Sequence, residues 1–263
     1  MAIGVWIGAF MTWSDPIYYG PMIASLAVFL ICVCGNSIGN ILNVEGEHVN
    51  HTSRALIKGT FSAGFSLVIA IVCDLGAIMA AISVNWQVAV IVVVALILIV
   101  AYNFKLKRVP LVGNIVMALL GGLTFVTGGL AVNPIWIWEL PGPLIPAVFI
   151  FLLLLVLEIL KDVENIDSDS KIGITTFPQV VGARSALLIA IGLFVVLVSF
   201  TIVTVLAEWF DVAYKIIAVY IIDLPLLVLL ILVWSNPSIG MLKASSVCLK
   251  LGIALVIVTM IIA

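Results

Sequence analysis

Two polar segments of this 263-residue chain share an unusual spacing of oxygen-bearing side chains. Within each segment these positions advance by steps of four, three and four residues, which places them on one face of a helix. Their members are Asn36, Asn40, Asn43 and Glu47 in the first segment, and Glu158, Asp162, Asn165 and Asp169 in the second. The repeated spacing predicts two helical stripes rich in carboxylate and amide oxygens.

Two such stripes facing each other would suit Mg²⁺. This hard cation prefers oxygen ligands and usually binds through one or two carboxylates, keeping its other positions for water and substrate phosphates. Polar residues that simply lie where a helix leaves the membrane would explain one acidic loop. They would not explain two segments with matched spacing. We therefore predict a magnesium site made by Asn40, Asn43, Glu47, Asp162 and Asp169, with Asn36 and Asn165 in supporting positions.

Basic side chains close to these stripes would neutralise a diphosphate, because Lys and Arg are the usual partners of phosphate oxygens. The candidates for phosphate binding are Arg54, Lys105, Lys107, Arg108 and Lys161. For Lys107 and Arg108 taken singly, an ordinary membrane anchor explains the charge equally well. Tyr102 and Asn114 are predicted to orient a substrate, and Asn114 needs a polar partner because it lies one turn inside an apolar segment.

The composition shows what must position these residues. Hydrophobic residues make up 65% of the chain and charged residues 9%, with a mean hydropathy of +1.39. Soluble domains contain about 45–50% apolar and about 25% charged residues. A soluble enzyme, a disordered chain and a nucleic-acid-binding protein are therefore excluded, and an integral membrane protein remains. The cysteines are expected to be small apolar residues of the bundle: Cys32, Cys34, Cys73 and Cys248.

The apolar runs predict an all-α bundle of nine transmembrane helices in a single domain, 1–263, because backbone groups in lipid must be satisfied within each segment. The runs do not alternate in polarity, which argues against a β-barrel. They lie near 1–13, 17–42, 60–83, 86–103, 109–131, 143–161, 182–207, 213–234 and 246–263. The first is short, since thirteen residues rise only about 20 Å.

With nine helices, ten of the eleven basic residues fall on one face of the membrane and only Lys215 on the other. The positive-inside rule then places the N-terminus and the polar stripes on the cytoplasmic side of a multi-pass cell-membrane protein. Asp74 and Asp223 lie within spans, where ionisable groups are functional candidates, although neither receives a ligand role. His48 and His51 are interpreted as part of a solvated loop.

The sequence resembles the UbiA superfamily of membrane prenyltransferases. The segment from Lys161 to Asp169, followed by Lys171, Gly173, Thr176 and Pro178, is similar to the second Asp-rich motif of the family and its K-x-G-x-x-T-x-P continuation. Residues 105–114 and 121–125 are similar to a pattern of the branch that builds archaeal ether lipids. The first motif departs from the family pattern, with Asn40, Asn43 and Glu47 at three of its acidic positions, and Asn165 replaces an aspartate of the second.

The resemblance implies a UbiA-type bundle that uses Mg²⁺ to transfer a geranylgeranyl group from its diphosphate to geranylgeranylglyceryl phosphate, a membrane lipid acceptor. An aromatic acceptor, as in quinone or chlorophyll synthesis, is an alternative on the same fold. A homologue that only binds lipids or diphosphates is another, favoured by the amide substitutions. A transporter is disfavoured, because the ionisable residues gather at one face rather than at mid-membrane.

Overall fold

The computed structural model describes residues 1–12, 19–42, 63–171 and 174–262, and every regular element in these ranges is helical. Eight helices are long and apolar enough to cross a membrane, and one shorter apolar helix, α1 (Ala2–Met11), precedes them. The prediction of an all-helical membrane bundle with a short first helix is confirmed. The long spans are α2 (Tyr19–Leu42), α4 (Ala63–Val84), α5 (Trp86–Phe104), α6 (Val112–Val132), α7 (Leu144–Glu164), α10 (Ala183–Leu206), the span of α11 (Val212–Ile216), η3 (Ile217–Asp223) and α12 (Leu224–Ser235), and α13 (Ile239–Ile262).

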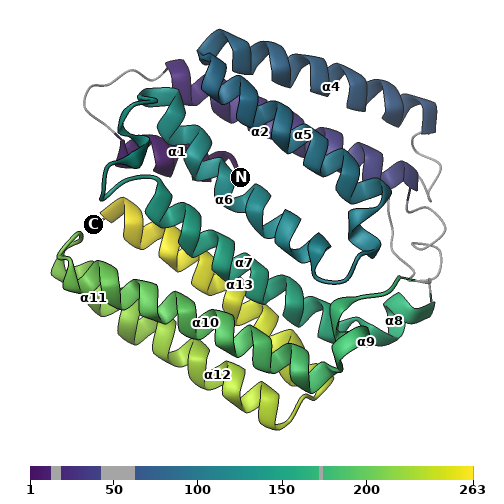
Figure 1. The fold of residues 1–263 in the computed structure, drawn as a ribbon, viewed down its shortest axis with the longest axis vertical. Coiled ribbons are helices and arrows are strands. Elements are labelled where there is room, and N and C mark those ends of the chain that lie inside the picture. The colour runs from purple at the N-terminus through teal and green to yellow at the C-terminus, as the bar shows by residue number, and fades with distance from the viewer. Residues whose placement is uncertain (13–18, 43–62, 172–173, 263) are drawn as a thin grey trace.

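The helices form two groups (Figure 1). One apolar core joins α2, α4, α5 and part of α6, and the other joins α7, α10, α12 and α13. Helices α1 and α6 lie between the two groups and contribute to both cores. Most of the remaining apolar side chains are exposed on the outside of the bundle, as expected where lipid is the solvent.

The last helix begins seven residues earlier than the sequence predicted, at Ile239 instead of residue 246. The serine hydroxyls near the predicted boundary are satisfied within the helix or by a neighbour. The Ser245 hydroxyl donates to the Met241 carbonyl oxygen at 2.7 Å, and the Ser246 hydroxyl donates to Glu164 on α7 at 3.2 Å. Because serine can bond to its own helix, its presence did not end the span.

Helices α1 and α6 pack with their backbones in contact. A Cβ atom on Gly8 would meet the carbonyl oxygen of Phe125, and one on Gly128 would meet the carbonyl oxygen of Val5. Small residues allow this approach, which is a common way for helices to associate in a membrane. The contact fixes α1 against the centre of the bundle despite its ten residues.

Two described connections meet at one end of the bundle, seen at the right of Figure 1. The turn η1 (Leu106–Arg108) joins α5 to α6, and the short helices α8 (Ile166–Lys171) and α9 (Phe177–Val181) follow α7. The Gln179 side-chain amide donates to the Ile166 carbonyl oxygen at 3.2 Å, which ties α9 to α8. This end of the bundle carries most of the polar residues singled out by the sequence.

Gly182 separates α9 from α10 and has φ +85° and ψ 146°, a conformation that is nearly restricted to glycine. No atom lies within 4 Å of the position a Cβ would take, so a substitution acts through the backbone alone. We expect Gly182→Ala to lower the free energy of unfolding by about 1–3 kcal/mol, measured by thermal or denaturant unfolding of the detergent-solubilised protein. An unchanged unfolding midpoint would show that this turn has another conformation.

Candidate functional site

A polar cavity of about 180 Å³ lies where α5, α6 and α7 reach this end of the bundle. The segment after α8 closes its remaining side, and the Ile174 N–H holds that segment by donating to the Asp169 carbonyl oxygen at 3.0 Å. The cavity is lined by Tyr102, Lys107, Val109, Pro110, Gly113, Asn114, Glu158, Lys161, Asp162, Asn165, Asp169, Ile174, Thr175, Thr176 and Phe177. Carboxylates, amides and ammonium groups thus meet in one chamber at the edge of an apolar bundle.

Asp162 is fixed in the cavity by a hydrogen bond between neighbouring helices. The Asn114 side-chain amide, in the first turn of α6, donates to Asp162 Oδ2 on α7 at 2.8 Å. Asn114 is 8% exposed, so its partner compensates for the loss of water. The expectation that this amide needs a polar partner is confirmed, and the partner belongs to the second predicted stripe.

The charges in the cavity come close to balance. Glu158, Asp162 and Asp169 face two ammonium groups, those of Lys107 and Lys161. Lys161 Nζ lies 2.6 Å from Glu158 Oε1, one turn away on α7. Burial raises the pKa of Asp169, and the positive charge of Lys107 opposes that rise. The arrangement can bind an anion through the lysines and a cation through the two aspartates.

The structure brings seven of the predicted site residues to this one cavity: Tyr102, Lys107, Asn114, Lys161, Asp162, Asn165 and Asp169. Lys105 and Arg108 flank Lys107 in sequence, but they are exposed and do not line the cavity. Asn36 is exposed on α2. Asn43, Glu47 and Arg54, together with the side chain of Asn40, lie outside the described residues, so the assignment of the first stripe stays a prediction.

Glu158, Thr175 and Thr176 also line the cavity, although no site role was predicted for them. Glu158 was recognised as part of the second stripe, and its spacing was the signal that could have placed it in the site. Thr176 belongs to the motif that follows that stripe, but a hydroxyl has no charge pattern that marks it in a sequence.

The oxygen atoms that line the cavity can supply some, but not all, of the ligands of a magnesium ion. Asp162 and Asp169 supply the hard oxygen atoms that Mg²⁺ prefers, and Asn165 lies between them in sequence. Among the residues that the structure describes, no three His, Cys, Asp or Glu side chains are grouped closely enough to hold a metal ion. The remaining ligands would have to come from the first polar segment, from substrate phosphates or from water.

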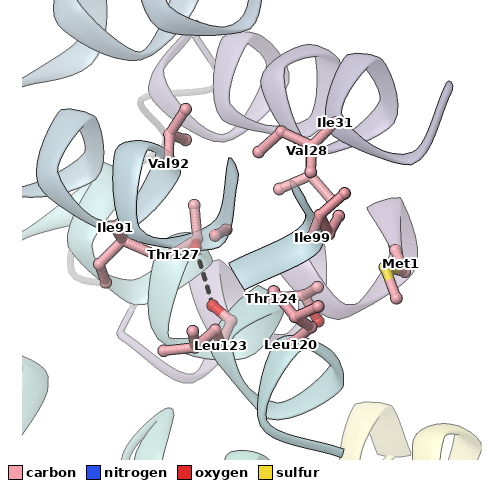
Figure 2. A pocket seen from close by; sticks show the side chains of 11 residues that line it. Met1, Val28, Ile31, Ile91, Val92, Ile99, Leu120, Leu123, Thr124 and Thr127 are labelled. Atoms are coloured by element: carbon pink, nitrogen blue, oxygen red, sulfur yellow. Dashed lines mark hydrogen bonds between the residues drawn. The ribbon is translucent and has the colours of Figure 1, made fainter. Parts of the chain in front are cut away.

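An apolar pocket of about 30 Å³ lies between α1, α2, α5 and α6, deeper in the bundle (Figure 2). Its lining residues are Met1, Val28, Ile31, Ile91, Val92, Ala95, Ile99, Leu120, Leu123, Thr124 and Thr127. The two threonine hydroxyls donate to carbonyl oxygens of their own helix, those of Gly121 and Leu123, each at 2.7 Å. The pocket therefore presents an almost wholly apolar surface.

The pocket and the polar cavity share helix faces. On α5, Val92, Ala95 and Ile99 line the pocket, and Tyr102, one turn further along, lines the cavity. Because these residues are three or four positions apart, they lie on one side of the helix. The same side of the bundle thus offers a charged end and, deeper in the membrane, an apolar end.

Replacing Asn114 tests whether the position of Asp162 matters. In Asn114→Leu the carboxylate loses its donor, and groups that orient metal ligands are typically worth 10–100-fold in activity. We expect turnover in a prenyl-transfer assay to fall by about that factor. Asn103→Leu is the matched control, because among the described residues the Asn103 amide donates within α5, to the Ile99 carbonyl oxygen at 2.9 Å. Equal losses in both variants would argue against a special role for the bond between Asn114 and Asp162.

The fold and the site define a class, that of multi-pass helical membrane proteins with a charged cavity at one end of the bundle and an apolar pocket beneath it. The sequence profile of the UbiA prenyltransferase family matches residues 1–244. The chain therefore belongs to the UbiA prenyltransferase family, and the resemblance seen in its motifs is confirmed.

Individual relatives agree with this assignment. The chain is 28% identical to the digeranylgeranylglyceryl phosphate synthase of Methanosphaera stadtmanae over 201 residues, which cover 76% of this chain and 72% of that protein. A solved digeranylgeranylglyceryl phosphate synthase structure has a TM-score of 0.80 at 24% identity, covering 99% of this chain and 91% of the other. A UbiA homologue from Archaeoglobus fulgidus bound to GPP and Mg²⁺ has a TM-score of 0.65 at 17% identity, covering 98% and 93%. At these identities the two structures establish the fold alone.

Proposed function

We propose that this protein transfers a geranylgeranyl group from geranylgeranyl diphosphate to the free hydroxyl of geranylgeranylglyceryl phosphate, with Mg²⁺ as cofactor. The observation that carries the proposal is the pairing of a charged cavity with an apolar pocket along the same faces of α5 and α6. A prenyl diphosphate has the same two parts, an anionic head and an apolar tail. The name of the M. stadtmanae relative supports the lipid acceptor over an aromatic one.

Each part of the cavity has a task in this reaction. Asp162 and Asp169 would hold the metal ion, and Lys107 and Lys161 would bind the oxygens of the diphosphate. When bound, Mg²⁺ neutralises the negative charge that develops on the leaving diphosphate. Donors already in place stabilise that charge without having to reorganise, which is commonly the largest contribution to catalysis.

The carbon–oxygen bond of the allylic diphosphate breaks in this reaction, and the hydroxyl oxygen of the acceptor forms the new ether bond as its proton is released. Tyr102 and Asn114 lie in the same cavity and support the orientation of the two substrates. Holding the hydroxyl close to the allylic carbon makes the step effectively unimolecular. The apolar pocket, at about 30 Å³, can take only a small part of the geranylgeranyl chain, and its apolar walls exclude water, which would otherwise compete with the hydroxyl.

We infer that the polar cavity faces the cytoplasm of the cell. The connections at the cavity end carry Lys105, Lys107, Arg108, Lys161 and Lys171, whereas Lys215 lies near the opposite end of the bundle. Short loops rich in Lys and Arg remain on the cytoplasmic side during insertion. Labelling of single cysteines in the two sets of loops with a membrane-impermeant reagent tests this orientation.

A prenyl-transfer assay tests the function. The purified protein in lipid nanodiscs is given radiolabelled geranylgeranyl diphosphate with either geranylgeranylglyceryl phosphate or an aromatic acid as acceptor, each with Mg²⁺ and with EDTA. We expect a product with two prenyl chains from the glycerol lipid, and only with Mg²⁺. Transfer to the aromatic acid alone would overturn the choice of acceptor, and turnover that persists in EDTA would overturn the role of the metal.

A homologue that binds prenyl diphosphates without transferring them is the second candidate. The amides at Asn40, Asn43 and Asn165 favour it, because each replaces a charged ligand of the family pattern with a neutral one. If the native chain binds geranylgeranyl diphosphate but transfers nothing, and Asn40→Asp with Asn43→Asp gains activity, the binding role is correct. Activity of the native chain rejects it.

A further inference from the structure

Thr176 has a buried hydroxyl that the described structure leaves without a hydrogen bond. The residue is 7% exposed, lines the polar cavity and precedes α9. Its backbone N–H is satisfied, because Gln179 Oε1 accepts from it at 3.1 Å. Its Oγ1 approaches the Gln179 N–H in a capping-box arrangement, but that contact falls short of a hydrogen bond. The hydroxyl hydrogen of Thr176 thus has no acceptor among the described residues.

A buried hydroxyl without a hydrogen-bond partner is uncommon in folded proteins. Most buried polar atoms in folded proteins have a partner, and an unsatisfied one costs about 1–3 kcal/mol. The carboxylates of Glu158, Asp162 and Asp169 line the same cavity, yet none of them accepts from Thr176. Most other buried threonines of this chain donate to a carbonyl oxygen of their own helix, as Thr124 and Thr127 do. Thr176 differs because it precedes its helix, so its hydroxyl has no carbonyl one turn earlier.

The residues around Thr176 indicate which hydrogen-bond partner its hydroxyl would take. Lys107 and Lys161 line the cavity and attract an anion, and a hydroxyl adds a short, directional donor that a lysine cannot supply. The side chain is also held in place. It is β-branched, Pro178 follows in the first turn of α9, and Gln179 ties that helix to the Ile166 carbonyl oxygen. A fixed donor loses little conformational entropy when its ligand binds.

We propose that the Thr176 hydroxyl donates a hydrogen bond to a phosphoryl oxygen of a substrate bound in this cavity. The proposal rests on the proposed function, because it assumes a phosphorylated substrate. That oxygen belongs either to the prenyl diphosphate or to the phosphate of the glycerol lipid, and the two sources can be separated experimentally. An ordered water molecule is the competing occupant of the same position.

The test compares Thr176→Val, which keeps the shape and removes the hydroxyl, with Thr176→Ser, which keeps the hydroxyl. Thr259→Val is the matched control, since Thr259 is also buried but donates to the Val256 carbonyl oxygen within α13. Calorimetric titrations use a non-reactive thiolo analogue of geranylgeranyl diphosphate and, separately, geranylgeranylglyceryl phosphate. Binding is measured with one substrate at a time, so the result does not depend on catalytic turnover.

We expect Thr176→Val to weaken the binding of one of the two ligands by about tenfold, the size of a hydrogen bond to a charged group. Thr176→Ser should retain affinity within about threefold, and Thr259→Val should match the native protein. The ligand that loses affinity identifies the phosphoryl group. The proposal is overturned if Thr176→Val binds both ligands normally, as a water-only role requires, or if Thr176→Ser loses as much as Thr176→Val. A protein that binds both ligands but transfers nothing would refute the proposed function while leaving this test intact.

Discussion

Asp162→Asn is expected to lower the rate of prenyl transfer by about 10²–10³-fold, the usual effect of removing one group that stabilises developing charge. The substitution changes a carboxylate into an amide of the same shape. Asp162 is the carboxylate that the Asn114 amide holds in the cavity at 2.8 Å, so its position is fixed before any ligand arrives. Replacing its charge removes a proposed metal ligand and leaves two carboxylates, Glu158 and Asp169, beside the two lysines of the cavity.

The control for this prediction is Asp167→Asn. Asp167 lies in the same segment but is exposed and does not line the cavity, so its replacement should leave turnover within about threefold. Both variants should elute as monodisperse protein with unchanged unfolding midpoints, since neither carboxylate packs in a core. Initial rates with saturating geranylgeranyl diphosphate measure the effect. Near-normal turnover in Asp162→Asn would remove this residue from the metal site and with it the proposed role of the second stripe.

Much of the fold could be predicted because lipid imposes a simple rule on the sequence. A helix must satisfy its own backbone, so a long apolar run between polar breaks identifies a span. The sequence placed the start of the last span at residue 246, whereas α13 begins at Ile239, and the Ser245 hydroxyl in the added turns bonds to its own helix. Hydropathy measures the polarity of a residue but not whether its polar atoms already have partners.

The site was harder to predict than the spans. The spacing of Asp162, Asn165 and Asp169 predicted a shared helical face, and all three line the cavity, although α7 ends at Glu164 and Asp169 lies on α8. The link from Asn114 to Asp162 joins different helices, and only the packing of α6 against α7 decides it. The same limit applies to Lys105, which precedes η1, and Lys107, which lies within it. Lys105 and Lys107 are two positions apart in sequence, yet only Lys107 lines the cavity, because a short turn directs successive side chains differently.

Gly128→Ala is expected to be, with Gly8→Ala, among the most destabilising additions of a single methyl group to the described part of this bundle. A Cβ at Gly128 would meet the Val5 carbonyl oxygen and the backbone of Ala9, and neither can move aside as a flexible side chain could. Helix α1 would have to separate from α6, which removes buried contacts along the whole of its ten residues. We expect a loss of more than about 3 kcal/mol, above the usual range for added methyl groups in a well-packed core.

Gly192→Ala makes the same chemical change on α10, where no atom lies within 4 Å of the new Cβ. That variant should unfold within about 1 kcal/mol of the native protein, because a helical alanine is no worse than glycine. The measurement is thermal unfolding in one detergent, with the fraction of monodisperse protein recorded for each variant. Two variants of equal stability would mean that α1 and α6 are not in backbone contact. Because Met1 on the N-terminal side of α1 lines the apolar pocket, that result would also remove one wall of the space assigned to the prenyl chain.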